Sequence, residues 1–194
     1  MAAFFSSLGK TIAAGVVLLL ILMGIAGTFS LLGGMDYWRF FMRYLHVLSG
    51  VMWIGLLWYF NFVQTPSMPK IPDAEKPAVS KVIAPTALFW FRWGAMSTII
   101  TGLLLASMNG YIGQALSLQK PFAAIGVGMW LGAIMWFNVW FIIWPNQKKA
   151  LGIVQVSPEE KAAAAKKAGM TSRINTMLSI PMLFCMVAQQ NGGF

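Results

Sequence analysis

One short stretch of the chain gathers the residue types that could hold a redox cofactor. His46 is the only histidine, and Arg39 and Arg43 precede it by seven and three residues. At helical spacing these three side chains share one face, which Gly50 continues. An imidazole with a small residue four positions further on suits an axial haem ligand, because it leaves room for the porphyrin. The pattern makes His46 a candidate ligand of haem iron, with Gly50 beside it and the two arginines near the haem propionates.

A plainer interpretation of His46 competes with this one. The histidine lies about two helical turns from the expected membrane interface, and intramembrane ionisable groups mark functional sites most clearly when they are deep. A neutral imidazole could instead donate a hydrogen bond to a neighbouring helix, with the arginines on lipid phosphate. The sequence by itself favours this structural role. If haem is bound, a methionine is the second ligand or the position is open, because a second histidine is lacking.

Arg92 is the other charged residue inside an apolar segment. It lies roughly two turns from the cytoplasmic end of its predicted helix, and no Asp or Glu lies in any predicted span to neutralise it. The guanidinium could extend to lipid phosphate. It could also bind an anionic ligand, a quinone carbonyl or helix-terminal carbonyls, with Asn146, Asn175 and Thr176 expected at a similar depth. Arg92 is therefore a second candidate cofactor-binding residue.

The composition predicts a membrane protein. Hydrophobic residues make up 58% of the chain and charged residues only 10%, whereas soluble domains carry about 25% charged residues. We expect an all-α fold, a bundle of about five transmembrane helices, with residues 1–34 as an N-terminal span and 35–194 as a four-helix membrane domain. The predicted spans are long enough to cross a bilayer: Thr11–Leu32, Arg39–Gln64, Pro85–Met108, Pro121–Trp144 and Ser172–Gln189.

Prolines and one capping motif mark the expected helix ends. Pro66 and Pro145 are predicted to end their helices, because proline lacks the backbone N–H and clashes with the preceding turn. The polar segment 146–173 contains Ser157–Glu160, whose sequence Ser-Pro-Glu-Glu is typical of a helix start. This predicts a short amphipathic surface helix that ends near Gly169.

The charge distribution predicts the orientation and the partners. The net charge is +9, but the basic residues lie in loops, as the positive-inside rule requires. Ten lysines and arginines fall on one side and three on the other, which predicts a multi-pass protein of the bacterial inner membrane with a cytoplasmic N-terminus and a periplasmic C-terminus. Membrane lipids and other membrane subunits are the expected partners, and nucleic acid is not.

Four sequence stretches resemble a known family. The segments YLHVLSGVMWIGLLWYFNFVQ, LFWFRWGAMSTIITG, MWLGAIMWFNVWFIIWPNQKK and SRINTMLSIPMLFCMVA together resemble the urate oxidase N-terminal membrane domain of bacterial urate hydroxylases. The resemblance covers roughly residues 35–188 and implies a helical membrane domain in a redox setting. In those enzymes the domain is joined to a cytochrome c domain, which we do not expect here, because the sequence has one cysteine, Cys185, and no C-x-x-C-H motif.

Three functions follow as hypotheses. The preferred one is a non-catalytic accessory subunit that packs in a larger respiratory or photosynthetic complex. The second is a b-type haem or quinone-binding electron-transfer module that uses His46. The third is a membrane-bound urate-oxidising enzyme.

Overall fold

The computed structural model describes residues 2–192, and every regular element in this range is helical. This confirms the all-α fold class. The chain divides into an N-terminal unit that ends at Phe41 and a larger unit that begins at Met42. The helices are α1 (Ala2–Phe5), α2 (Leu8–Ile25), α3 (Met35–Trp58), α4 (Thr65–Ser67), α5 (Lys76–Ala78), α6 (Ala84–Met108), α7 (Ile112–Leu116), α8 (Ala123–Phe137), α9 (Trp144–Ala150) and α10 (Pro158–Asn191).

The N-terminal unit consists of α1, α2, a 3₁₀ turn at Thr28–Leu31 and the first residues of α3. The predicted single span Thr11–Leu32 is wrong at its end, because α2 stops at Ile25. Gly27, with a left-handed φ of 68°, separates α2 from the 3₁₀ turn. None of the residues of α2 is buried.

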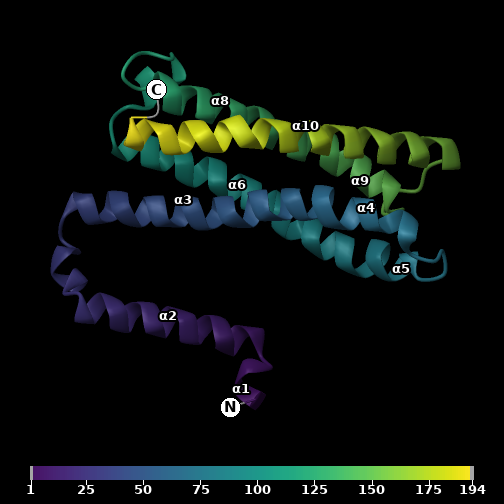
Figure 1. Ribbon diagram of the computed structural model, residues 1–194, viewed down its shortest axis with the longest axis horizontal. Coiled ribbons are helices and arrows are strands. Elements are labelled where there is room, and N and C mark those ends of the chain that lie inside the picture. Colours follow the sequence, from purple (N-terminus) through teal and green to yellow (C-terminus); the bar gives the residue numbers. More distant parts are fainter. Residues whose placement is uncertain (1, 193–194) are drawn as a thin grey trace. The chain divides into compact units, whose positions relative to one another are not determined.

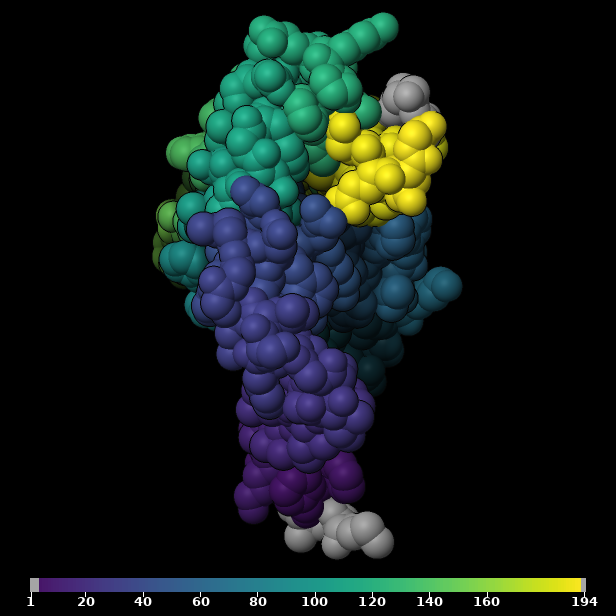
Figure 2. Space-filling view, turned by 90° about the vertical axis from the view of Figure 1, so that its left-hand side faces the viewer, coloured from purple at the N-terminus to yellow at the C-terminus, as the bar shows by residue number. Residues whose placement is uncertain are grey.

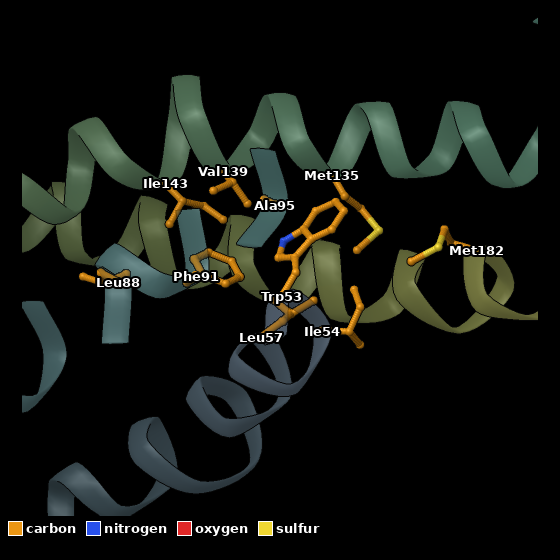
Figure 3. Close-up of a cluster of buried hydrophobic side chains, with 10 residues drawn as sticks. All are labelled: Trp53, Ile54, Leu57, Leu88, Phe91, Ala95, Met135, Val139, Ile143 and Met182. Atoms are coloured by element: carbon orange, nitrogen blue, oxygen red, sulfur yellow. The ribbon is translucent and has the colours of Figure 1, made fainter. Parts of the chain in front are cut away.

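The larger unit is a helical bundle in which α6, α8 and α10 run along a common direction (Figure 1). Its core is shared by four parts of the chain: the end of α3, the middle of α6, the α8 segment and α10. Figure 3 shows the indole of Trp53 among side chains from the other helices. The core residues are Trp53, Ile54, Leu57, Leu88, Phe91, Ala95, Met135, Val139, Ile143 and Met182.

Three of the long helices continue past prolines that were expected to limit them. A π-helical stretch precedes each proline: Tyr59–Gln64 before Pro66, Val79–Ile83 before Pro85, and Asn138–Ile143 before Pro145. Such local π adjustments satisfy the backbone groups that a proline leaves unpaired, so membrane helices tolerate it. The helices consequently run over Met35–Lys70, Lys76–Met108 and Ala123–Ala150, and the predicted ends at Gln64 and Trp144 and start at Pro85 are wrong.

The C-terminal helix α10 also corrects a prediction. Ser157 caps it as expected, with its Oγ accepting a hydrogen bond of 3.2 Å from the Glu160 N–H. The short surface helix is wrong, however, because α10 continues through Gly169 and Pro181 to Asn191. Ala164 and Ala168 are buried on the same face as Asn175, so packing against the bundle favours one continuous helix.

Among the described residues, four helical segments are long and apolar enough to cross a membrane: Leu8–Ile25, Met35–Lys70, Lys76–Met108 and Ala123–Ala150. The fifth predicted span lies within α10, which is less apolar than these four segments. Polar residues on its buried face, including Thr171, Asn175 and Ser179, lower its apolarity together with Arg173 and Gln189. A membrane protein with several spans is therefore supported by composition, and a count of five stays a prediction.

Candidate functional site

The imidazole of His46 is held by α6. Its Nδ1 lies 3.0 Å from the backbone oxygen of Thr98 and 3.3 Å from Oγ1 of Thr101. A carbonyl can only accept a hydrogen bond, so Nδ1 carries the proton and donates it to Thr98. The other ring nitrogen, Nε2, then carries the lone pair, and it has no hydrogen-bond partner among the residues described. This hydrogen bond to a neighbouring helix is the one that the structural interpretation of His46 predicts, and it is also the kind of backbone support that metal-ligating histidines usually have.

A glycine on α6 makes room for the ring. A Cβ atom at Gly102 would lie 2.8 Å from Cε1 of His46 and 3.2 Å from its Nδ1, closer than side chains approach one another in proteins. Gly102 therefore lets the imidazole lie against the backbone of α6. Together, Thr98, Thr101 and Gly102 position the ring in one orientation.

Beside His46 lies a cavity of about 760 Å³. This volume is within the range of roughly 300–1,000 Å³ that is usual for cofactor and small-molecule sites. Its wall is mostly apolar and comes from α3, α6, α8 and α10, and it includes Gly50, Trp53, Met129, Trp136, Met182 and Met186. No Asp, Glu or Lys side chain lines it within the described part of the chain, so the cavity suits a large apolar ligand.

Polar groups gather where the cavity meets the end of the bundle. Arg43 donates a hydrogen bond of 3.2 Å from Nη1 to Oε1 of Gln190, and Tyr111 lines the same cavity. Burial raises the pKa of Tyr111, and the positive charge of Arg43 acts against that rise, so the two groups are electrostatically coupled. Figure 2 looks onto this end of the bundle, where the yellow end of α10 borders the teal and blue helices.

The structure brings three of the five sequence-predicted site residues together. His46, Arg43 and Gly50 line the one cavity, and Trp53 continues the same face of α3. Arg39 is not among the lining residues and instead forms an ion pair of 2.9 Å with Asp36. Arg92 also lies outside the cavity lining.

Arg92 lies against aromatic rings. Its guanidinium carbon lies 3.5 Å from the centroid of the Trp144 ring and 5.7 Å from that of Trp140. Its Nε donates a long hydrogen bond of 3.4 Å to the backbone oxygen of Leu88. A polar partner such as Asn146, Asn175 or Thr176 was expected at this depth, but the contacts that the described residues make with the guanidinium are cation–π contacts with tryptophans and the bond to Leu88.

The comparisons with known proteins bear on the second half of the chain. Residues 111–192 match the urate oxidase N-terminal family. The match confirms the resemblance predicted from the sequence for this part of the chain. Neither a curated protein nor a solved structure matches the chain.

The part that matches the urate oxidase N-terminal family supplies α7, α8 and α10, hence one wall of the cavity with Tyr111, Met129 and Gln190. His46 and its support on α6 precede the matched range. The cavity is thus formed between the family-matched segment and the two preceding helices, and the assignment of His46 depends on geometry alone.

A buried polar layer joins helices within the bundle, and of its members only Asn175 was singled out from the sequence. Asn138 donates to Asn175 at 2.8 Å, and Asn175, which is fully buried, donates to the Met135 oxygen at 2.9 Å. One turn earlier on α10, Ser172 accepts at its Oγ a hydrogen bond of 2.8 Å from Asn61. Such side chains join membrane helices through hydrogen bonds, so this layer fixes α10 against its neighbours.

Proposed function

We propose that the chain is a membrane-embedded electron-transfer module that holds a b-type haem at His46, as an accessory subunit of a larger redox complex. The observation that carries this proposal is the His46 geometry. Nδ1 donates to the Thr98 oxygen at 3.0 Å, which leaves the lone pair on Nε2, and the His46 residue lines a large apolar cavity. A bound haem would supply reversible one-electron chemistry, and the residues of this chain would bind and orient it.

The rest of the cavity agrees with an amphiphilic, flat ligand. Gly50 has nothing within 4 Å of the position of a Cβ atom, so the space next to His46 is open. Arg43 and Tyr111 lie at the polar end, where they could hold carboxylates. Met129, Met182 and Met186 line the wall, and a thioether is a known second haem ligand. A cluster of three or more His, Cys, Asp or Glu side chains is absent among the described residues, so a bare metal ion is a poorer occupant.

A quinone fits the histidine less well. Its carbonyl oxygens accept hydrogen bonds, but Nε2 in this tautomer offers no proton. Binding a quinone at His46 would therefore require a protonated imidazole or a donor from elsewhere, such as Arg43. Urate oxidation gains no support from the cavity either, since His46 would be the one lining side chain, among the described residues, of a type that takes up or releases a proton near neutral pH.

The proposal predicts how much haem the purified protein contains. Wild-type protein extracted in mild detergent should contain about one haem b per chain, because the site has a single histidine ligand. Acid–acetone extraction with a pyridine haemochrome assay measures the haem, and solvent extraction with chromatography measures quinone. Stoichiometric quinone with no haem in well-folded protein would contradict the haem proposal and favour the quinone.

The orientation predicted from the charges is part of the same proposal. We expect the polar end of the cavity, next to Arg43 and Gln190, to face the periplasm, and the lysine-rich ends of α9 and α10 to face the cytoplasm. A periplasm-specific reporter fused after Phe194 should be active, and one inserted near Ala163 should be inactive. The reverse pattern of activity would overturn this orientation.

A further inference from the structure

A second group of residues, outside the cavity, has the properties of a binding site for a phosphate group. Arg92 on α6 and Lys148 on α9 both lie near the ring of Trp144. The Arg92 guanidinium carbon is 3.5 Å from the ring centroid, and the Lys148 Nζ is 5.7 Å from it. Trp144 and Lys148 are four residues apart on one helix and so share a face. We call these three residues the basic–tryptophan cluster.

The charges of this cluster are not neutralised by the protein. The described residues form two ion pairs, Arg39 with Asp36 and Lys76 with Asp73, and neither involves the cluster. Only Nε of Arg92 has an acceptor, the Leu88 oxygen at 3.4 Å. The outer N–H groups of the guanidinium therefore have no acceptor among the described residues, although all three side chains are half-buried.

The stacking contact prepares the guanidinium for a particular ligand. A guanidinium that lies on an aromatic ring keeps its N–H groups in its own plane, directed away from that ring. The indole of Trp144 thus fixes the plane of the donors, while their edge stays available. Two parallel N–H groups on such an edge match the oxygens of a phosphate, and a nearby ammonium adds a second charge.

The position of the cluster indicates where such a phosphate would come from. Trp144 lies about 21 residues after Ala123 at the start of α8, which is roughly 32 Å of helix. This distance is close to the thickness of about 30 Å of the hydrocarbon core of a bilayer. If α8 begins at one membrane interface, Trp144 is at the other, which is the level of lipid phosphates.

We propose that Arg92, Trp144 and Lys148 bind the phosphate group of an anionic phospholipid at the membrane interface. The group would be held at the edge of the Arg92 guanidinium and next to Lys148. This site is independent of the haem proposal, because it shares no residue with the cavity. It would anchor the π-helical junction between α8 and α9 to the lipid.

Native mass spectrometry of delipidated protein tests the site with three probes: phosphatidylglycerol, phosphatidylcholine and inorganic phosphate. We expect wild type to bind phosphatidylglycerol with higher affinity than phosphatidylcholine. Arg92→Gln should weaken phosphatidylglycerol binding by about tenfold or more, because charge-assisted hydrogen bonds are lost. Arg173→Gln is the matched control, since Arg173 is an exposed arginine on α10, and it should bind as wild type does.

Lys148→Gln provides a second variant on a different helix, in case Arg92→Gln alters the fold, and it should weaken binding in the same direction. If inorganic phosphate at millimolar concentration displaces the lipid, the site recognises phosphate itself; if it does not, the site recognises the whole headgroup. Both results support the phosphate site. Equal phosphatidylglycerol binding by wild type, Arg92→Gln and Lys148→Gln would overturn it.

Discussion

Replacing Gly126 by alanine should lower the free energy of unfolding of the bundle by about 1–3 kcal/mol, the usual cost of overpacking. The backbones of α7 and α8 approach each other closely at this residue. A Cβ atom at Gly126 would collide with the backbone oxygen of Ala115, and it would lie 2.9 Å from Cδ2 of Leu118. Ala115 is fully buried, so its carbonyl cannot move without displacing α7.

The measurement is reversible denaturation in mixed micelles, followed by tryptophan fluorescence. Gly113→Ala is the control, because Gly113 is an exposed residue of α7 with nothing within 4 Å of a Cβ position. Alanine there should be neutral or slightly stabilising, since glycine weakens helices relative to alanine. Equal stabilities for the two variants would show that the close approach of α7 to α8 is wrong.

The second large effect is expected at Gly102, one of the α6 residues that position the His46 ring. Gly102→Ala should weaken haem binding by about 10- to 100-fold, the usual range when a group that orients a metal ligand is changed. The added methyl group would occupy the place of the His46 ring, 2.8 Å from Cε1. The ring must then turn away from α6, and its hydrogen bond to the Thr98 oxygen breaks.

Haem titration of the apoprotein, followed by the Soret absorbance, measures this effect. The Gly113→Ala variant again serves as the matched glycine-to-alanine control, because it lies outside the cavity lining. Thermal unfolding separates a local effect from a loss of fold. Unchanged haem affinity in folded Gly102→Ala would mean that the orientation of His46 seen here is not the one that binds the cofactor.

The sequence alone was sufficient to predict a helical protein with spans of membrane length, and to predict the α3 residues that line one side of the candidate site. Apolar segments of membrane length predicted the helices, and helical spacing predicted that Arg39, Arg43 and His46 share a face that Gly50 continues. Arg43, His46 and Gly50 line one cavity, whereas Arg39 does not. Their partners could not be predicted in the same way. Thr98 and Gly102 are ordinary helix residues in sequence terms, and only the packing of α3 against α6 gives them a role.

Helix ends were predicted poorly for a physical reason. Proline and glycine are local signals, but Pro66, Pro145 and Gly169 all lie within continuous helical segments. Local π-helical geometry accommodates the prolines, and the packing of Ala164 and Ala168 in the bundle offsets the preference of Gly169 for a helix end. Tertiary contacts outweigh local propensity at these positions.

The most direct test of the central claim is a reduced-minus-oxidised absorbance spectrum of the purified protein. We expect a b-type haem signal in wild type that is lost in His46→Ala. Leu48→Ala, an exposed position on the same helix, should keep the signal. A well-folded wild type without any haem signal, or a His46→Ala variant with an undiminished one, would contradict the assignment of His46 as the haem ligand.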